Sequence, residues 1–169
     1  MGKRQHADLD SDQKRLSKIH KCQTSTSSTL GVRLCGMQVY QIDSGRYIFT
    51  DKYCGRNLTV DGFRSALKEF FNNGRTKRTD VLPALIDRVR SLHETIDSLS
   101  AYRFYSGSLL IVYDGLTSSN LIDIRMIDFA HTIIGTRNPS STDALDPDRD
   151  YLFGLERLMD VFKEILNEE

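Results

Sequence analysis

The run SLLIVYDG at residues 108–115 is followed, after a short polar stretch, by IDIRMIDF at residues 122–129. The first run is rich in β-forming residues and closes with Asp-Gly, a pair typical of turns. The second run alternates apolar residues with Asp123 and Arg125, as expected for a strand with one buried face. Together the two runs predict a pair of antiparallel strands.

Segments with other periodicities surround these strands. Apolar residues recur at helical spacing over 63–71, 82–99 and 155–166, and more weakly over 11–22. Pro83 is tolerated only in the first turn of a helix, so the helix of residues 82–99 should begin near Asp80. A second strand pair is predicted over 31–49, around the turn sequence Asp-Ser-Gly-Arg. The sequence therefore predicts an α+β fold, with an antiparallel sheet and flanking helices.

The composition limits the classes of protein that fit. The chain has 169 residues, with 23 Lys plus Arg and 23 Asp plus Glu, so it fits one domain or one large lobe without net charge. No apolar run approaches the roughly 20 residues of a membrane span. The three cysteines form no CxxC pair, which indicates a reducing cytoplasmic or nuclear setting. The basic N-terminal segment lacks interleaved aromatic residues, so nucleic-acid binding is not expected.

Asp128 is the most informative polar residue, because it ends an apolar strand. Burial at that position would make a bare charge costly, so we expect the carboxylate to hold a metal ion, a cation or backbone donors. In phosphoryl transfer, the Mg²⁺ ion that bridges the phosphates is often held by an Asp on such a turn. The residues alone leave two roles open for Asp128, a metal ligand and a capping group at the strand end.

The first 21 residues are strongly polar and basic. Lys14, Lys18 and Lys21 fall on one face of the expected 11–22 helix, and further cations precede it. Several cations are the natural complement of a compact polyanion such as a polyphosphorylated inositol. A solvated helix face is the alternative interpretation.

Several motifs resemble those of one known family. SLLIVYDG and RMIDFAHT, residues 125–132, are similar to the paired signature of inositol polyphosphate kinases. LCGMQVYQ, residues 34–41, and YRFY, residues 102–105, resemble the hexakisphosphate kinase branch, and YLFGLE, residues 151–156, resembles the closing helix. The resemblance implies that residues 1–169 are the C-terminal lobe of a two-lobed, protein-kinase-like fold whose N-terminal lobe is absent. It also implies ATP-dependent phosphorylation of inositol hexakisphosphate, or a related inositol phosphate, to an inositol pyrophosphate.

The resemblance also implies roles for individual residues. Asp128 would be the Mg²⁺ ligand that serves bound ATP. Ser108 would support the metal or the hydrogen bonds of the active site, although a strand hydroxyl bonded to the backbone remains an equal alternative. The residues expected to contact the inositol phosphate are Lys3, Arg4, Lys14, Lys18 and His131.

The chain departs from the family pattern at its start. The family's Pro-x-x-x-Asp-x-Lys-x-Gly motif is matched only at Gly2, so the Asp and Lys of that motif have no counterpart. With the ATP-holding half also missing, we expect this chain alone to be inactive, and a missing lobe or another protein to be its partner. A non-catalytic module that binds inositol phosphates or a protein is the alternative function. Gly107 also departs, since the branch usually has Ser before Ser108.

Overall fold

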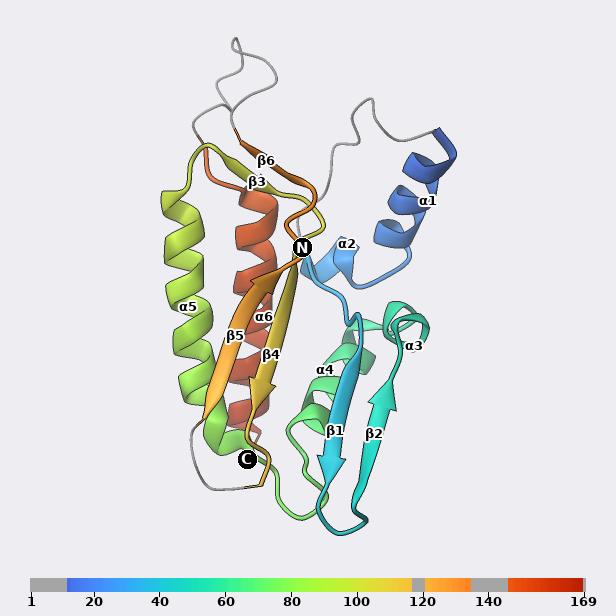
Figure 1. Cartoon of the computed structure of the whole chain (residues 1–169), viewed down its shortest axis with the longest axis vertical. Helices are drawn as coiled ribbons and strands as arrows, with labels where there is room; N and C mark the ends of the chain where they lie inside the picture. The colour runs from blue at the N-terminus through green and yellow to red at the C-terminus, as the bar shows by residue number, and fades with distance from the viewer. Residues whose placement is uncertain (1–11, 117–120, 135–145, 169) are drawn as a thin grey trace.

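The computed structural model describes residues 12–116, 121–134 and 146–168 (Figure 1). Helices and short strand pairs alternate along the chain, as the sequence predicted. In chain order the elements are α1 (Asp12–Gln23), α2 (Ser27–Leu30), β1 (Met37–Gln41), β2 (Arg46–Thr50), α3 (Lys52–Arg56), α4 (Val60–Phe70), the 3-10 turn η1 (Thr79–Val81), α5 (Leu82–Ser98), β3 (Tyr102–Phe104), β4 (Ser108–Tyr113), β5 (Ile122–Ile127), β6 (Thr132–Ile134) and α6 (Arg149–Asn167).

The strands of the described residues form three two-stranded antiparallel sheets, β1–β2, β3–β6 and β4–β5. The predicted hairpin at residues 108–129 is the β4–β5 pair, in which Ser108 lies opposite Ile127 and Tyr113 lies opposite Ile122. The α+β class and the antiparallel pairing are therefore confirmed, although the pairing is divided among separate ladders.

The β4–β5 hairpin has one buried and one exposed face. Leu109 and Ile111 of β4 pack against the core, whereas Leu110 and Val112 are 47% and 54% exposed. Residues opposite one another in an antiparallel pair project to the same side, so Ser108 shares the exposed face with its partner in β5. The exposed face is mixed, because the ion pair of Arg125 and Asp123 lies opposite Leu110 and Val112.

Helices α5 and α6 cover the buried face of the hairpin (Figure 1). Their contact is fully buried at Leu85 and Val89 of α5 and at Leu155 and Phe162 of α6. This arrangement follows from the apolar stripes of the two helices, since each stripe must be removed from water. The predicted helices over 82–99 and 155–166 are thus confirmed as the main support of the hairpin.

The helix boundaries differ from the predictions in two places. Helix α5 begins at Leu82 rather than near Asp80, because the 3-10 turn η1 precedes it, and Pro83 lies in its first turn as expected. Helix α3 was not predicted, because its five residues carry no apolar stripe. Its start is set by Asp51, whose side chain accepts the backbone N–H groups of Tyr53 and Cys54.

The three cysteines are free thiols. None of the helices in the described parts of the chain is both long enough and apolar enough to cross a membrane.

Candidate active site

The β3–β6 and β4–β5 ladders are successive parts of one bent ribbon. Residues 105–107 lead from β3 into β4, and residues 128–131 lead from β5 into β6. At this bend Ser106 has φ +59° and Asp128 has φ +64°, and no other non-glycine residue that the structure describes has a positive φ. The left-handed region is unfavourable for side chains with a Cβ atom, and such strain tends to concentrate at functional sites.

The bend brings two of the predicted site residues together. Ser108 is the first residue of β4 and lies opposite Ile127, the last residue of β5. Asp128 follows Ile127 directly, so the hydroxyl and the carboxylate come from adjacent chain segments at the same end of the hairpin. Their chemical roles remain predictions.

Asp128 is exposed, whereas the sequence suggested a costly buried charge. That expectation is wrong because β5 ends at the surface, next to the uncovered face of the hairpin. The Asp128 side chain makes no hydrogen bond or ion pair with another described residue, so the structure offers no support for a capping role.

The donor set at the bend suits Mg²⁺ bound together with phosphates. No group of three or more His, Cys, Asp or Glu side chains that could hold a metal occurs within the described ranges. A Mg²⁺ ion commonly keeps several waters and is held by one or two carboxylates and the substrate's phosphates. A single exposed carboxylate such as that of Asp128 fits this mode of binding.

His131 lies on the same connection as Asp128. It is half-buried and directly precedes β6. The turn is closed by the backbone N–H of Thr132, which donates to the carbonyl oxygen of Phe129 at 3.0 Å. Because the turn is short, His131 and Asp128 belong to one corner of the molecule.

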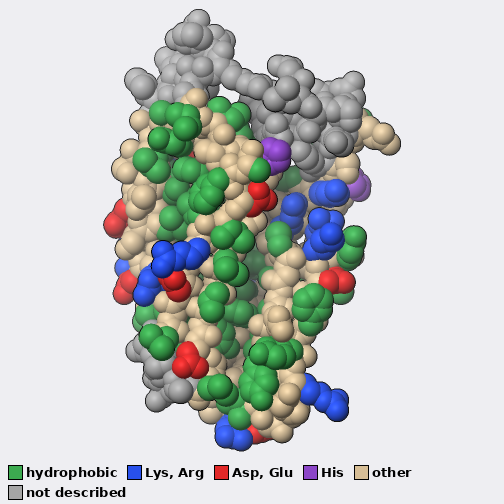
Figure 2. All heavy atoms as spheres, in the orientation of Figure 1, with side chains coloured by type: hydrophobic (Ala, Val, Ile, Leu, Met, Phe, Trp, Pro, Cys, Tyr) green, Lys and Arg blue, Asp and Glu red, His purple; other side chains and the backbone are tan. Residues whose placement is uncertain are grey.

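The basic residues of the prediction are only partly described. Lys14 and Lys18 lie in α1, and Lys3 and Arg4 lie outside the described residues. Helix α1 is in the same half of the molecule as the end of β5 (Figure 1). Figure 2 shows Lys and Arg side chains gathered in the region between α1 and α3.

The far end of β4 is anchored by side chains that the sequence did not single out. The Tyr113 hydroxyl donates to the Phe70 carbonyl oxygen at 2.6 Å, and burial raises the pKa of Tyr113 to about 12, so the phenol stays protonated. Arg78 is 5% exposed, pairs with Asp80 at 2.9 Å and donates to the Asp114 carbonyl oxygen at 2.5 Å. The loop between α4 and α5 therefore holds β4 in place.

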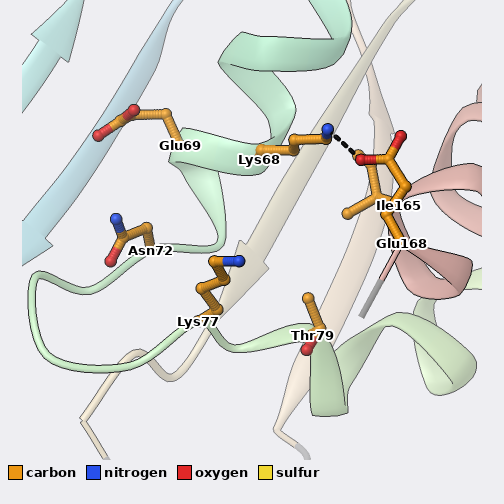
Figure 3. Close-up of a pocket in the computed structure, with 7 residues that line it drawn as sticks. All are labelled: Lys68, Glu69, Asn72, Lys77, Thr79, Ile165 and Glu168. Atoms are coloured by element: carbon orange, nitrogen blue, oxygen red, sulfur yellow. Dashed lines mark hydrogen bonds and ion pairs between the residues drawn. The ribbon is translucent and has the colours of Figure 1, made fainter.

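A separate pocket of about 240 Å³ lies at the other end of the molecule, beside the C-terminal turn of α6 (Figure 3). Lys68 and Glu168 form an ion pair across it, so one of its cations is already neutralised. It is remote from the bend and does not belong to the candidate site. The lining residues are Lys68, Glu69, Asn72, Lys77, Thr79, Ile165 and Glu168.

The fold is that of inositol phosphate multikinases. One solved structure of inositol phosphate multikinase superposes with a TM-score of 0.81 at 22% identity, covering 98% of this chain and 76% of that one. The multikinase of S. cerevisiae in complex with ADP and Mn²⁺ superposes with a TM-score of 0.78 at 25% identity, covering 98% and 75%. The kinase-like α+β fold expected from the motifs is thus confirmed.

Residues 1–163 match the protein-family model described as inositol polyphosphate kinase. The chain therefore belongs to the inositol polyphosphate kinase family. It is 43% identical to inositol hexakisphosphate kinase 3 of Mus musculus, over 98% of this chain and 46% of that protein. It is 38% identical to inositol hexakisphosphate kinase 2 of Homo sapiens, over 99% and 47%. The chain thus spans about half the length of these curated relatives.

Proposed function

We propose that this chain is part of an ATP-dependent phosphotransferase that converts inositol hexakisphosphate, or a related inositol phosphate, to an inositol pyrophosphate. The observation that carries the proposal is the meeting of Ser108 and Asp128 at a strained bend, in a chain whose residues 1–163 match the family. The names of the relatives, which are inositol hexakisphosphate kinases, support the choice of substrate.

Asp128 is the proposed ligand of a Mg²⁺ ion that accompanies ATP. When bound, the ion neutralises charge on the phosphates of the nucleotide. The exposed Asp128 carboxylate has no partner among the described residues that would compete with a cation. The ADP and Mn²⁺ in the yeast multikinase complex support a nucleotide and a divalent ion here. Ser108 supplies a hydroxyl at the same end of the hairpin and steadies the hydrogen bonds around that ion.

The basic segment and the bend together form the proposed acceptor site. In the reaction, an oxygen of the acceptor phosphate bonds to the γ-phosphorus of ATP, the bond to the β–γ bridging oxygen breaks, and ADP leaves. Catalysis of this step is mostly positioning and charge stabilisation, which cations at fixed places supply. The proposed acceptor contacts are Lys3, Arg4, Lys14, Lys18 and His131.

We assign residues 1–169 to the C-terminal lobe of a two-lobed kinase. Because the chain spans about half of its relatives, turnover is expected to require the part of the relatives that this chain does not match. The chain tested by itself should therefore be inactive. The alternative is a module that binds inositol phosphates or a protein without catalysis.

A chimera decides between the two functions. This chain replaces the matching half of the Mus musculus inositol hexakisphosphate kinase 3, and ATP-dependent conversion of inositol hexakisphosphate is measured. We expect the chimera to turn over and the 169-residue chain alone to be silent. A folded chimera without turnover, together with calorimetric binding of inositol hexakisphosphate to the isolated chain, would instead establish the binding module.

A further inference from the structure

Asp148 joins the start of α6 to a distant strand. It is the N-cap of α6 and is 3% exposed. One carboxylate oxygen accepts the backbone N–H of Tyr151 at 3.1 Å, which is ordinary helix capping. The other oxygen accepts the backbone N–H of Phe104 at 2.7 Å, and Phe104 lies 44 residues earlier. The second bond is not needed to cap the helix.

The bond to Phe104 acts at the bend of the ribbon. Phe104 is the last residue of β3 and lies opposite Thr132, the first residue of β6. Two connections join this pair to the β4–β5 hairpin. Residues 105–107 link β3 to β4, and residues 128–131 link β5 to β6. A carboxylate that fixes Phe104 therefore fixes both sides of the bend, including the connection that contains Asp128.

Helix α6 is a rigid base for this bond. Tyr151 in its first turn is fully buried, and its ring contacts that of Phe104 with the centroids 5.8 Å apart. Arg103 makes a second link, because its guanidinium donates to the Asp146 carbonyl oxygen at 2.7 Å. Asp148 is, with Arg78, one of two buried charged side chains in the described part of the chain. A buried carboxylate is retained where its oxygens are bonded, as here.

We propose that Asp148 is a positioning residue for the candidate active site. Its carboxylate holds the ribbon bent, and the bend keeps Asp128 in the left-handed backbone conformation that sets the direction of the Asp128 carboxylate. This conformation costs free energy for a residue with a Cβ atom, less for Asp than for most, so contacts of the surrounding structure help to maintain it. Asp148 itself contacts neither metal nor substrate, and the inference rests on the proposed metal-binding role of Asp128.

The test uses NMR on the complete 169-residue chain with the variant Asp148→Ser. Serine is a good N-cap and retains an acceptor for the Tyr151 N–H, but it is too short to serve Phe104 as well. We expect the Phe104 amide to exchange about 10-fold faster or more, the factor that corresponds to losing one charge-assisted hydrogen bond. The three-bond HN–Hα coupling constant and the Cα and Cβ chemical shifts of Asp128 should change from the values typical of a left-handed backbone, because the residue is no longer held at positive φ.

A second readout follows binding of Mn²⁺ alone. Line broadening of the amides of residues 127–131 should be lost in Asp128→Asn. In Asp148→Ser the same broadening should appear only at about 10-fold higher Mn²⁺ concentration, as is typical when a group that orients a metal ligand is removed. The matched control is Asp51→Ser, because Asp51 also caps a helix but bonds only to neighbouring residues. The control should change neither readout.

Two outcomes discriminate. Faster Phe104 exchange with an unchanged Asp128 coupling would make Asp148 a purely structural residue and overturn the inference, while the kinase proposal would stand. Unchanged broadening in Asp128→Asn would instead remove the metal-binding role, and with it the functional part of the inference. If Asp148→Ser does not fold, Asp148→Asn gives the same test, since the amide keeps one acceptor oxygen and cannot accept both N–H groups.

Discussion

Gly107 packs on the ring of Tyr151, so that a Cβ atom at position 107 would lie 3.4 Å from Cε2 of that ring. The Tyr151 hydroxyl is buried and has no hydrogen-bond partner among the described residues. Burial raises the pKa of this tyrosine, so the group remains a neutral phenol. An unsatisfied polar atom therefore lies beside a position that has no side chain.

This relationship predicts that Gly107→Ser stabilises the protein. The added Cβ meets only ordinary contact distances, and its restriction of the unfolded chain contributes roughly 0.4–1 kcal/mol, which Gly107→Ala shares. The serine hydroxyl should add about 1 kcal/mol more by pairing with the Tyr151 hydroxyl. Urea unfolding of the three proteins measures both increments. In a Tyr151→Phe background, Gly107→Ser and Gly107→Ala should have the same free energy of unfolding. If Gly107→Ser remained more stable there, the two hydroxyls would not be hydrogen-bonded.

The two faces of the β4–β5 hairpin predict opposite responses at adjacent positions. Ile111 packs on the core, so Ile111→Ala should lower the free energy of unfolding by about 2 kcal/mol. Val112 is 54% exposed, so Val112→Thr should change it by less than about 0.5 kcal/mol. The same substitution should reduce self-association measured by light scattering, because exposed apolar patches promote it. Equal losses in the free energy of unfolding at Ile111 and Val112 would mean that the outer face of the hairpin is also covered.

The sequence was most informative where local pattern and packing coincide. The alternation at residues 122–127 predicted β5 and its buried face, and the stripes over 82–99 and 155–166 predicted the helices that cover it. In contrast, β3 and β6 have three residues each, too few for a period to be recognised. Each is defined by its pairing with the other, on the far side of the bend from β4 and β5.

The candidate site was predicted in part for the same reason. Ser108 and Asp128 lie in motifs, and strand pairing brings them together once the hairpin register is known. The exposure of Asp128 was not predicted, because it depends on what covers the outer face rather than on local sequence. Asp148 was not predicted at all, since its distinguishing bond to Phe104 joins residues 44 positions apart.

The Arg78–Asp80 pair predicts a specific dependence of stability on pH. Hydrogen bonding to Arg78 lowers the pKa of Asp80 below its ordinary value of 3.8. The folded protein thus keeps this carboxylate ionised at a pH where the unfolded chain is protonated. The stabilisation is present above the unfolded-state pKa and is lost as the pH falls through the folded-state pKa.

Asp80→Asn should accordingly lower the free energy of unfolding by about 1 kcal/mol at pH 7, a modest value because the Asp80 side chain is 46% exposed and screened by solvent. The gap between variant and wild type should narrow as the pH falls below about 4. Urea titrations at several pH values measure it. Asp87→Asn is the control, since Asp87 bonds only within its own helix. If the difference in free energy of unfolding between wild type and Asp80→Asn did not vary with pH, the Arg78–Asp80 ion pair would not be the source of the stabilisation.

The last prediction concerns Asp128 itself. In the chimera that carries this chain, Asp128→Asn should lower kcat by at least about 100-fold, because a neutral amide is a poor ligand for the ion that neutralises the transferred phosphate. Binding of inositol hexakisphosphate should change little, since Asp128 repels rather than attracts that anion. Asp123→Asn is the matched control: it removes the same charge from β5, which Asp128 directly follows, but Asp123 is paired with Arg125 at 2.8 Å and lies away from the bend.

The two variants are compared by kcat and by the Mg²⁺ concentration for half-maximal rate. Asp123→Asn should leave both close to the wild-type chimera, whereas Asp128→Asn should lower kcat and raise the Mg²⁺ requirement. Equal losses in the two variants would point to a general effect of charge on the hairpin. A loss in Asp128→Asn that excess Mg²⁺ or Mn²⁺ partly restores would identify the carboxylate as a metal ligand, because mass action compensates for a weakened site but not for a misfolded one.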